Sequence, residues 1–276
     1  MTPFDANERA ALDEHGYVVR EGVFSDARCA ALCQRLSELI VASARRQISG
    51  ALPSLSFWSL MPRSVDDAVA FWDLSRHTPS GPPETWESSV MRVGHGLHLV
   101  DGEFAAACQA PELTAPLASV GAVAVVQSAV VYKQPHSESV QFGLHQDSWY
   151  LPSEPDTLLL AFVALDHMDR ENGCLEVVPG SHRLPRQATL ALGPGGFVSV
   201  DGRPQGRPPD GAVALPMRRG SVAFLHGLTF HGSAPNRSAG PRRALIVHTL
   251  GAGSRMLPSS WVQAPAAGFA SLSVKT

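Results

Sequence analysis

The first part of the chain shows the apolar spacing of two helices with a short strand between them. Residues 5–14 predict a helix that Asp5 caps and Gly16 closes. The β-branched and aromatic residues at 17–20 predict a strand. From Ser25 to about residue 45, apolar residues lie three to four positions apart, as on one face of a longer helix. We expect this helix to pack on the outside of a sheet.

The apolar pattern breaks down between residues 49 and 89, where prolines alternate with large aromatic side chains. An aromatic-rich segment with little regular structure is typical of a lid or a pocket wall. The alternative is that these aromatics complete the core beneath a long loop, and the sequence leaves both interpretations open. In the next stretch, 89–100, we interpret His95 and His98 as structural, because the glycines that flank His95 indicate a turn or close packing.

Short apolar runs separated by turn residues predict strands through the remainder of the chain. The predicted strands are 122–133, 157–166, 174–178, 212–217, 221–225 and 243–250. Glu171-Asn172-Gly173 predicts a hairpin turn, and the Gly- and Pro-rich residues 193–211 predict a loop excursion. Short strands with turn chemistry between them are typical of a jelly roll or barrel. The sequence therefore predicts a mostly β fold with flanking α-helices.

Composition limits the classes of function. The chain has 276 residues, 44% of them hydrophobic and 17% charged, and its net charge of −3 with no basic block argues against nucleic acid as a partner. The longest apolar run, 158–165, is too short to span a bilayer, and no apolar segment near residue 1 predicts a signal peptide. The 4 cysteines lack zinc-ribbon spacing and are interpreted as buried free thiols. We expect a soluble, cytoplasmic protein that acts on a small molecule, with its oligomeric state left open.

One stretch, 144–150, carries the pattern of a metal site. Alternate side chains of a strand point the same way, so His145 and Asp147 should aim an imidazole and a carboxylate into one volume. Gln146 should point elsewhere. A second histidine from a distant strand would complete the 2-His-1-carboxylate triad that non-haem Fe(II) oxygenases use.

Three histidines downstream are candidates for the third ligand: His226, His231 and His248, each in or beside a predicted strand. An oxygenase of this type must also bind a dicarboxylate that chelates the iron at one end. A planar guanidinium with a hydroxyl is well suited to grip the other end. Ser233 lies two residues after His231, and Arg242 lies at the start of the next predicted strand. This pairing selects His231.

Several motifs of the chain together resemble a known family. The motifs are His145-Gln146-Asp147, Glu171-Asn172-Gly173-Cys174-Leu175, Pro179-Gly180-Ser181-His182, His231-Gly232-Ser233 followed by Arg242, and, upstream, Val93-Gly94-His95-Gly96-Leu97-His98, Gln127-Ser128 and Lys133-Gln134-Pro135-His136. They are similar to those of the phytanoyl-CoA dioxygenase family, and within it to the subgroup of phytanoyl-CoA dioxygenase domain-containing protein 1. The resemblance covers nearly the whole chain.

The resemblance implies a double-stranded β-helix, a jelly roll of the cupin type, that binds Fe(II) and 2-oxoglutarate and uses O2. By position, it implies that His145, Asp147 and His231 ligate the iron. It also implies that Arg242 and Ser233 hold the far carboxylate of 2-oxoglutarate.

The resemblance further implies that Arg92, Gln146, Ala129 and Val163 line the co-substrate pocket. Ala129 and Val163 are smaller than the methionine and tryptophan that are usual at these positions, which favours a roomier cavity. For Lys133, a role in the pocket and a place at a solvated strand end are both open.

We expect one domain over 1–276, with a helical flank at 1–48, a lid at 49–89 and the β-helix core at 90–255. The predicted reaction is hydroxylation, or another oxidation, of an unactivated C–H bond in a small, fairly apolar metabolite, with release of succinate and CO2. Two alternatives stay open. One is a cupin-like Zn²⁺ or Mn²⁺ isomerase or hydrolase, and the other is a non-catalytic binding protein on the same fold.

Overall fold

The computed structural model describes residues 2–52, 56–74, 79–137, 142–202 and 207–273. The helices are α1 (Ala6–His15), α2 (Asp26–Ile48), α3 (Phe57–Leu60), α4 (Leu97–Val100), α5 (Gly102–Cys108) and α6 (Pro111–Ser119), with 3₁₀ turns η1 (Met61–Ser64), η2 (Pro83–Ser89), η3 (Asp147–Trp149) and η4 (Ser181–Arg183). The strands are β1 (Tyr17–Arg20), β2 (Ala68–Trp72), β3 (Val90–His95), β4 (Ala122–Lys133), β5 (Phe142–His145), β6 (Ser153–Glu154), β7 (Leu159–Ala164), β8 (Leu175–Val177), β9 (Leu190–Gly193), β10 (Gly196–Ser199), β11 (Val213–Leu215), β12 (Val222–His226), β13 (His231–Ser233), β14 (Arg242–Gly251), β15 (Arg255–Met256) and β16 (Ala270–Ser271). None of the helices in these ranges has the length and apolar composition that a bilayer crossing needs.

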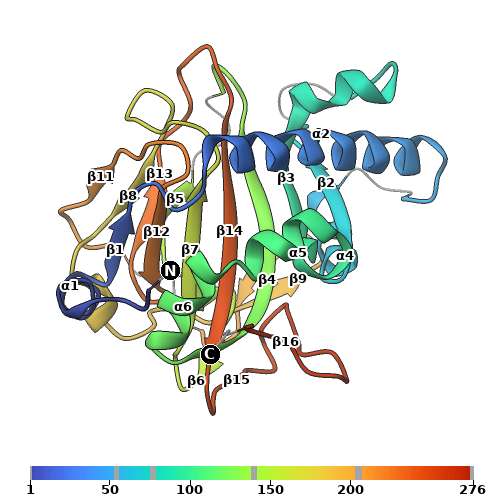
Figure 1. The fold of residues 1–276 in the computed structure, drawn as a ribbon. Helices are drawn as coiled ribbons and strands as arrows, with labels where there is room; N and C mark the ends of the chain where they lie inside the picture. The colour runs from blue at the N-terminus through green and yellow to red at the C-terminus, as the bar shows by residue number, and fades with distance from the viewer. Residues whose placement is uncertain (1, 53–55, 75–78, 138–141, 203–206, 274–276) are drawn as a thin grey trace.

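An eight-stranded antiparallel sheet forms the centre of the molecule (Figure 1). Its order is β1-β12-β7-β14-β4-β3-β2, with β16 beside β4. Helices α2, α5 and α6 cover one face of this sheet. Fully buried side chains such as Leu32, Phe104 and Leu113 pack there against Val130 and Val247 of the sheet. Each buried leucine in such a core stabilises the fold by roughly 1.5–3 kcal/mol.

A smaller sheet, of order β11-β8-β13-β5, faces the other side of the main sheet. Leu160, Phe162 and Ile246 of the main sheet meet Leu175 and Val177 of the smaller one in a second core. The chain crosses between the sheets from β7 to β8 and from β12 to β13. Two antiparallel sheets packed face to face in this way form a jelly roll, which confirms the predicted mostly β class with flanking helices.

The two N-terminal helices begin where the sequence predicts. The Asp5 side chain accepts a hydrogen bond from the backbone N–H of Glu8 at 2.8 Å, and Gly16 ends α1 with φ 80°. Ser25 caps α2, which runs slightly past its predicted end, to Ile48. The apolar face of α2 packs on the outside of the main sheet, as predicted.

Three predictions about the segments between the strands were wrong. The segment from 49 to 89, predicted to have little regular structure, contains β2, which pairs with β3 at one edge of the main sheet. Glu171-Asn172-Gly173 is a turn, but it carries the chain from one sheet to the other and makes no hairpin. The loop predicted at 193–211 contains β10, which pairs with β9.

Burial explains why β2 was missed. All five of its residues, Ala68–Trp72, are buried, so the strand lacks the polar alternation that marks a half-exposed one. Strands β1 and β2 also belong to the main sheet, although they lie in the predicted flank and lid. Residues 53–55 and 75–78 of the predicted lid, and 203–206 of the predicted loop, lie outside the described ranges.

Candidate metal centre and its two cavities

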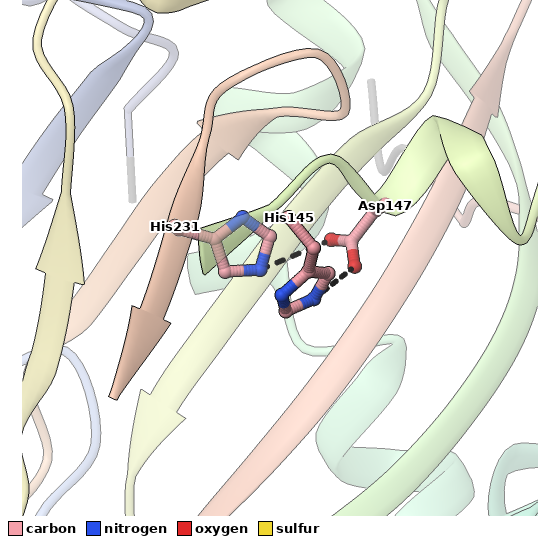
Figure 2. Close-up of side chains that lie close together, drawn as sticks. All are labelled: His145, Asp147 and His231. Carbon is pink, nitrogen blue, oxygen red and sulfur yellow. Dashed lines mark ion pairs between the residues drawn. The ribbon is translucent and has the colours of Figure 1, made fainter. Parts of the chain in front are cut away.

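Three side chains with metal-binding atoms meet between the two sheets. His145 ends β5 and His231 begins β13, and the two residues are partners in the ladder. Asp147 lies in a 3₁₀ turn just beyond β5, so the prediction that it shares a strand with His145 was wrong. The turn still directs the carboxylate toward both rings (Figure 2), and one ligand atom from each residue lies within 4.8 Å of the other two.

Backbone carbonyls orient both imidazoles. Nδ1 of His145 lies 2.8 Å from the carbonyl oxygen of Gly143, and Nδ1 of His231 lies 3.0 Å from that of Thr229. A carbonyl only accepts, so each Nδ1 carries the proton and each Nε2 keeps its lone pair. Both Nε2 atoms lie 3.6 Å from oxygens of Asp147. Burial lowers the pKa of His231 to about 4, which leaves a neutral imidazole at neutral pH. This donor set fits a single Fe(II) ion.

A chain of two hydrogen bonds from the main sheet holds Asp147 in place. Nε2 of His248 on β14 lies 2.9 Å from Oδ2 of Asp147, and Nε2 of Gln127 on β4 lies 2.9 Å from Nδ1 of His248. Burial alone would raise the pKa of the Asp147 carboxyl. Interactions with the neighbouring imidazoles, first the electrostatic attraction to His231 in the acid range where that ring is protonated and then hydrogen bonds, outweigh burial and hold that pKa well below its usual value. Asp147 is therefore an ionised ligand with a fixed orientation.

A cavity of about 70 Å³ lies beside the three residues, between the sheets, and we call it the inner cavity. Arg242 and Ser233 line it together with apolar side chains such as Leu160 and Phe162. Arg242 is only 1% exposed, and its Nη2 donates to the carbonyl of Gly173 at 2.7 Å. Its Nε and Nη1 have no partner among the described residues. Burial lowers the pKa of Arg242 to about 10, so it stays charged at neutral pH.

The turn at 171–173 and the neighbouring lysine support this arginine. Gly173 has φ +72°, and a Cβ there would lie 2.2 Å from the carbonyl oxygen of Ala234, so the turn excludes a side chain. Lys133 is fully buried opposite Arg242, and its Nζ donates to the carbonyls of Ser233 and Ala234. Burial, and then the charge of Arg242, lower its pKa to about 6. Lys133 is therefore no solvated strand end, and it fastens the strand that carries Ser233.

A larger cavity of about 340 Å³ also reaches His145 and Asp147, and we call it the outer cavity. Much of its wall is aromatic: Phe57, Trp58, Phe142, Tyr150, Phe197 and Trp261. Trp58 and Tyr150 make edge contacts with Phe197, with ring centroids 5.8 and 4.7 Å apart. A volume of this size and an aromatic wall are typical of a small-molecule site.

The aromatic segment at 49–89 divides between the two roles that the sequence left open. Phe57 and Trp58 line the outer cavity. Phe71, Trp72 and Trp86 are buried in the cores instead. The pocket wall and the core beneath a loop are thus both present, each in one part of the segment.

Arg92 on β3 lines both cavities. Its Nη1 lies 3.1 Å from Nε2 of His95, and Nδ1 of His95 lies 2.7 Å from Oγ of Ser64. The Ser64 hydroxyl donates to the carbonyl of Met61 at 2.7 Å, so it accepts from His95, whose Nε2 in turn accepts from Arg92. Burial, and then the charge of Arg92, hold the pKa of His95 well below its usual value. His95 has the structural place that the sequence predicts for it.

Comparison with known proteins agrees with this geometry. The sequence profile described as phytanoyl-CoA dioxygenase (PhyH) matches residues 12–244. The chain belongs to the phytanoyl-CoA dioxygenase family. Phytanoyl-CoA dioxygenase domain-containing protein 1 of Mus musculus is 30% identical over 285 residues, which cover 95% of this chain and 96% of that protein.

Solved structures show the same fold as this family member. The carbocyclase SnoK from nogalamycin biosynthesis, a non-heme alpha-ketoglutarate-dependent protein, is 21% identical with a TM-score of 0.65, covering 93% of this chain and 87% of SnoK. EctD from S. alaskensis, crystallised with 2-oxoglutarate and 5-hydroxyectoine, is also 21% identical with a TM-score of 0.65, covering 99% and 88%. These similarities confirm the predicted double-stranded β-helix.

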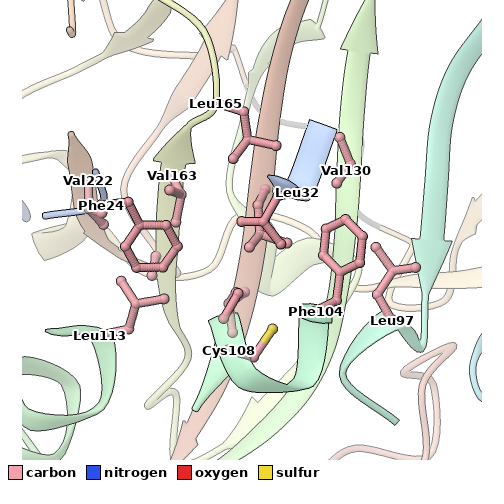
Figure 3. Packing of buried hydrophobic residues seen from close by; sticks show 14 of the residues in the cluster. Phe24, Leu32, Leu97, Phe104, Cys108, Leu113, Val130, Val163, Leu165 and Val222 are labelled. Atoms are coloured by element: carbon pink, nitrogen blue, oxygen red, sulfur yellow. The ribbon is translucent and has the colours of Figure 1, made fainter. Parts of the chain in front are cut away.

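The structure does not bring every predicted lining residue to the cavities. Val163 faces the helices and packs in the core that also holds Leu32 and Phe24 (Figure 3), while its neighbour Phe162 lines the inner cavity. That prediction was wrong by one residue of register, which reverses the face of a strand. Ala129 lies on the inner face of β4, but it packs against Gly94 and lines neither cavity.

Gln146 points away from the cavities, as strand alternation predicts. Its Nε2 donates to the carbonyl of Leu228 at 2.9 Å. Its Oε1 accepts from the indole of Trp149 and from the backbone N–H of Gln187. Both ends of the amide are therefore used by the fold, and the structure shows Gln146 in neither cavity wall.

Two residues that contribute to this phytanoyl-CoA dioxygenase site were not assigned from the sequence. His248 was considered only as a rival ligand, and Gln127 only as part of a motif. Strand alternation offers a signal for both, because even steps from Arg242 along β14 reach His248, and even steps from Lys133 along β4 reach Gln127. No periodic signal points to Phe197 or Trp261.

Proposed function

We propose that this chain is an Fe(II)- and 2-oxoglutarate-dependent dioxygenase. It hydroxylates, or otherwise oxidises, an unactivated C–H bond of a small, fairly apolar metabolite, and it releases succinate and CO2. His145, Asp147 and His231 bind the iron. Arg242 and Ser233 hold the far carboxylate of 2-oxoglutarate.

The observation that carries this proposal is the unpaired guanidinium of Arg242. A buried charge without a counter-ion is costly, and Arg242 has two unused donors and no carboxylate among its described hydrogen-bond partners. A dicarboxylate that chelates the metal would bring its second carboxylate into the same cavity and pair with the guanidinium in two charge-assisted bonds. An isomerase or hydrolase that used the same three metal ligands would leave Arg242 without a purpose.

Each of several residues around the metal site has its own role in the proposed reaction. When bound, iron with 2-oxoglutarate and O2 supplies the oxidation: the oxoacid is oxidised to succinate and CO2, and one oxygen atom enters the substrate C–H bond. The carbonyls of Gly143 and Thr229 keep both Nε2 atoms available to the metal. His248 holds the orientation of Asp147. Arg92 adds a second positive charge where the cavities meet, suited to the metal-binding end of the oxoacid.

Succinate formation tests the proposal. Purified protein with Fe(II), 2-oxoglutarate and air should release succinate, slowly without substrate and faster with a suitable one. Asp147→Ala should lower this rate at least about a hundredfold, because it removes the anionic ligand. Asp210→Ala serves as the matched control, since the Asp210 side chain is 94% exposed and lines neither cavity. Absence of succinate from the wild type, or an unchanged rate in Asp147→Ala, would contradict the proposal.

A further inference from the structure

Gln127 carries a polar atom that the proposed function leaves unused. Its side chain lines the outer cavity and the residue is only 5% exposed. Its Oε1 has no hydrogen-bond partner in the described parts of the chain. Buried acceptors are seldom left unpaired, because the lost hydration is not replaced. An unpaired acceptor on a cavity wall therefore points to a donor on the molecule that fills the cavity.

The hydrogen-bond chain to Asp147 determines which end of the Gln127 amide is left over. An ionised carboxylate only accepts, so His248 donates its Nε2 proton to Asp147. The ring then accepts at Nδ1, and Gln127 must present its NH2 group to that atom, 2.9 Å away. The amide oxygen is consequently the atom that remains for a ligand. Two hydrogen bonds, through His248, connect the amide group of Gln127 to Asp147.

The other residues that line the outer cavity indicate the shape, polarity and size of that ligand. The aromatic side chains of the outer cavity, among them Trp58, Phe197 and Trp261, favour a flat and largely apolar molecule. Arg92 is the single lysine or arginine among the described lining residues. A coenzyme A ester carries three phosphate groups, which one arginine cannot neutralise, and a cavity of about 340 Å³ suits a much smaller compound.

We propose that Gln127 selects the substrate: its Oε1 accepts a hydrogen bond from a hydroxyl or N–H group on a flat, mostly apolar ring compound that binds in the outer cavity. This inference rests on the proposed function for the site of oxidation, because the hydrogen bond would hold one face of the ring toward the metal ligands. The substrate class is thus a cyclic alcohol, phenol or amine without a coenzyme A group.

A pair of probes that differ only in the donor tests this selection. 2-Naphthol and 2-methoxynaphthalene share the ring, but the ether cannot donate a hydrogen bond. We expect calorimetric titration of the full chain to show 2-naphthol binding about tenfold more tightly than the ether, the effect of one hydrogen bond to a buried acceptor. In Gln127→Met, which keeps the length of the side chain but loses the amide oxygen, the two dissociation constants should agree within about threefold.

Gln127→Glu is the conservative control. It keeps an acceptor on the cavity wall, although it loses the N–H that Gln127 donates to His248, and it should keep the preference for 2-naphthol. Equal binding of the two probes by the wild type, no binding of either, or a preference that survives in Gln127→Met would each overturn the proposal. The titrations need neither iron nor O2. Selection by Gln127 and succinate formation can therefore fail separately.

Discussion

The inner and outer cavities share six lining residues, His145 and Asp147 among them, and differ in where much of the remaining wall comes from. Apart from Asp147, the wall of the inner cavity comes from strands of the main sheet and the smaller sheet, for example Phe162, Ser233 and Arg242. The outer cavity takes Phe57, Trp58, Phe197 and Trp261 from segments outside these sheets. Strands paired on both sides hold their side chains within narrow limits, whereas connecting segments can vary without loss of the fold. If the proposed function holds, the co-substrate end is built from strands of the scaffold, and the substrate end adds connecting segments to such strands.

The proposed metal ligands should show the largest effect. His145→Ala and His231→Ala each remove a nitrogen ligand, so we expect the affinity for Co(II), measured by competitive titration, to fall at least about a hundredfold. His167→Ala is the matched control, because the His167 side chain is 64% exposed in a different part of the molecule. Wild-type Co(II) affinity in either variant would contradict the assignment of that histidine as a metal ligand.

A change confined to the inner cavity should have the next largest effect. Arg242→Lys replaces the planar fork with a point charge, and the KM for 2-oxoglutarate should rise about tenfold or more. Arg243→Lys makes the same change one residue later, where the side chain lies on the other face of the strand and pairs with Asp166 at 2.8 Å. That control should leave the KM within about twofold of the wild type. An equal rise in both variants would mean that the effect comes from the strand and not from the cavity.

The smallest effects should come from single aromatic residues that line only one of the two cavities. Phe197→Leu should weaken 2-naphthol binding about threefold to tenfold, because it removes an edge contact of the aromatic wall, and it should leave the KM for 2-oxoglutarate nearly unchanged. Phe162→Leu should do the reverse, since Phe162 lines only the inner cavity. If both variants changed both constants alike, the two cavities would act as one.

Several of the strands that build the inner cavity could be predicted from the sequence, although β3 and β13 were not. The valine-rich run at 122–133 is β4, and the strand predicted at 243–250 is β14 to within a residue at each end. The choice of His231 over His226 and His248 followed from the need for an arginine and a hydroxyl nearby, and the structure brings Ser233 and Arg242 to one cavity. Two signals were sufficient here: the apolar pattern of the strands, and the requirement for an arginine and a hydroxyl that bind a dicarboxylate.

Other parts of the site could not be predicted in this way. Asp147 lies in a turn, whose direction depends on contacts with distant residues, as in the bond from the backbone N–H of Ser148 to the carbonyl of Gly227. Val163 was placed in the cavity wall, although the register of β7 turns it toward the helices. Phe197 and Trp261 reach the outer cavity only through the tertiary fold. Periodicity describes which residues share a face, but it does not say which distant segments meet.

The most direct test of the account is a crystal structure with Fe(II) and 2-oxoglutarate bound under anaerobic conditions. It should show one metal ion on Nε2 of His145, Nε2 of His231 and the Asp147 carboxylate, with the oxoacid in the inner cavity and its far carboxylate on Arg242. The outer cavity should stay open beside it. An oxoacid bound among Trp58 and Phe197, or a metal ion bound away from these three residues, would contradict the account.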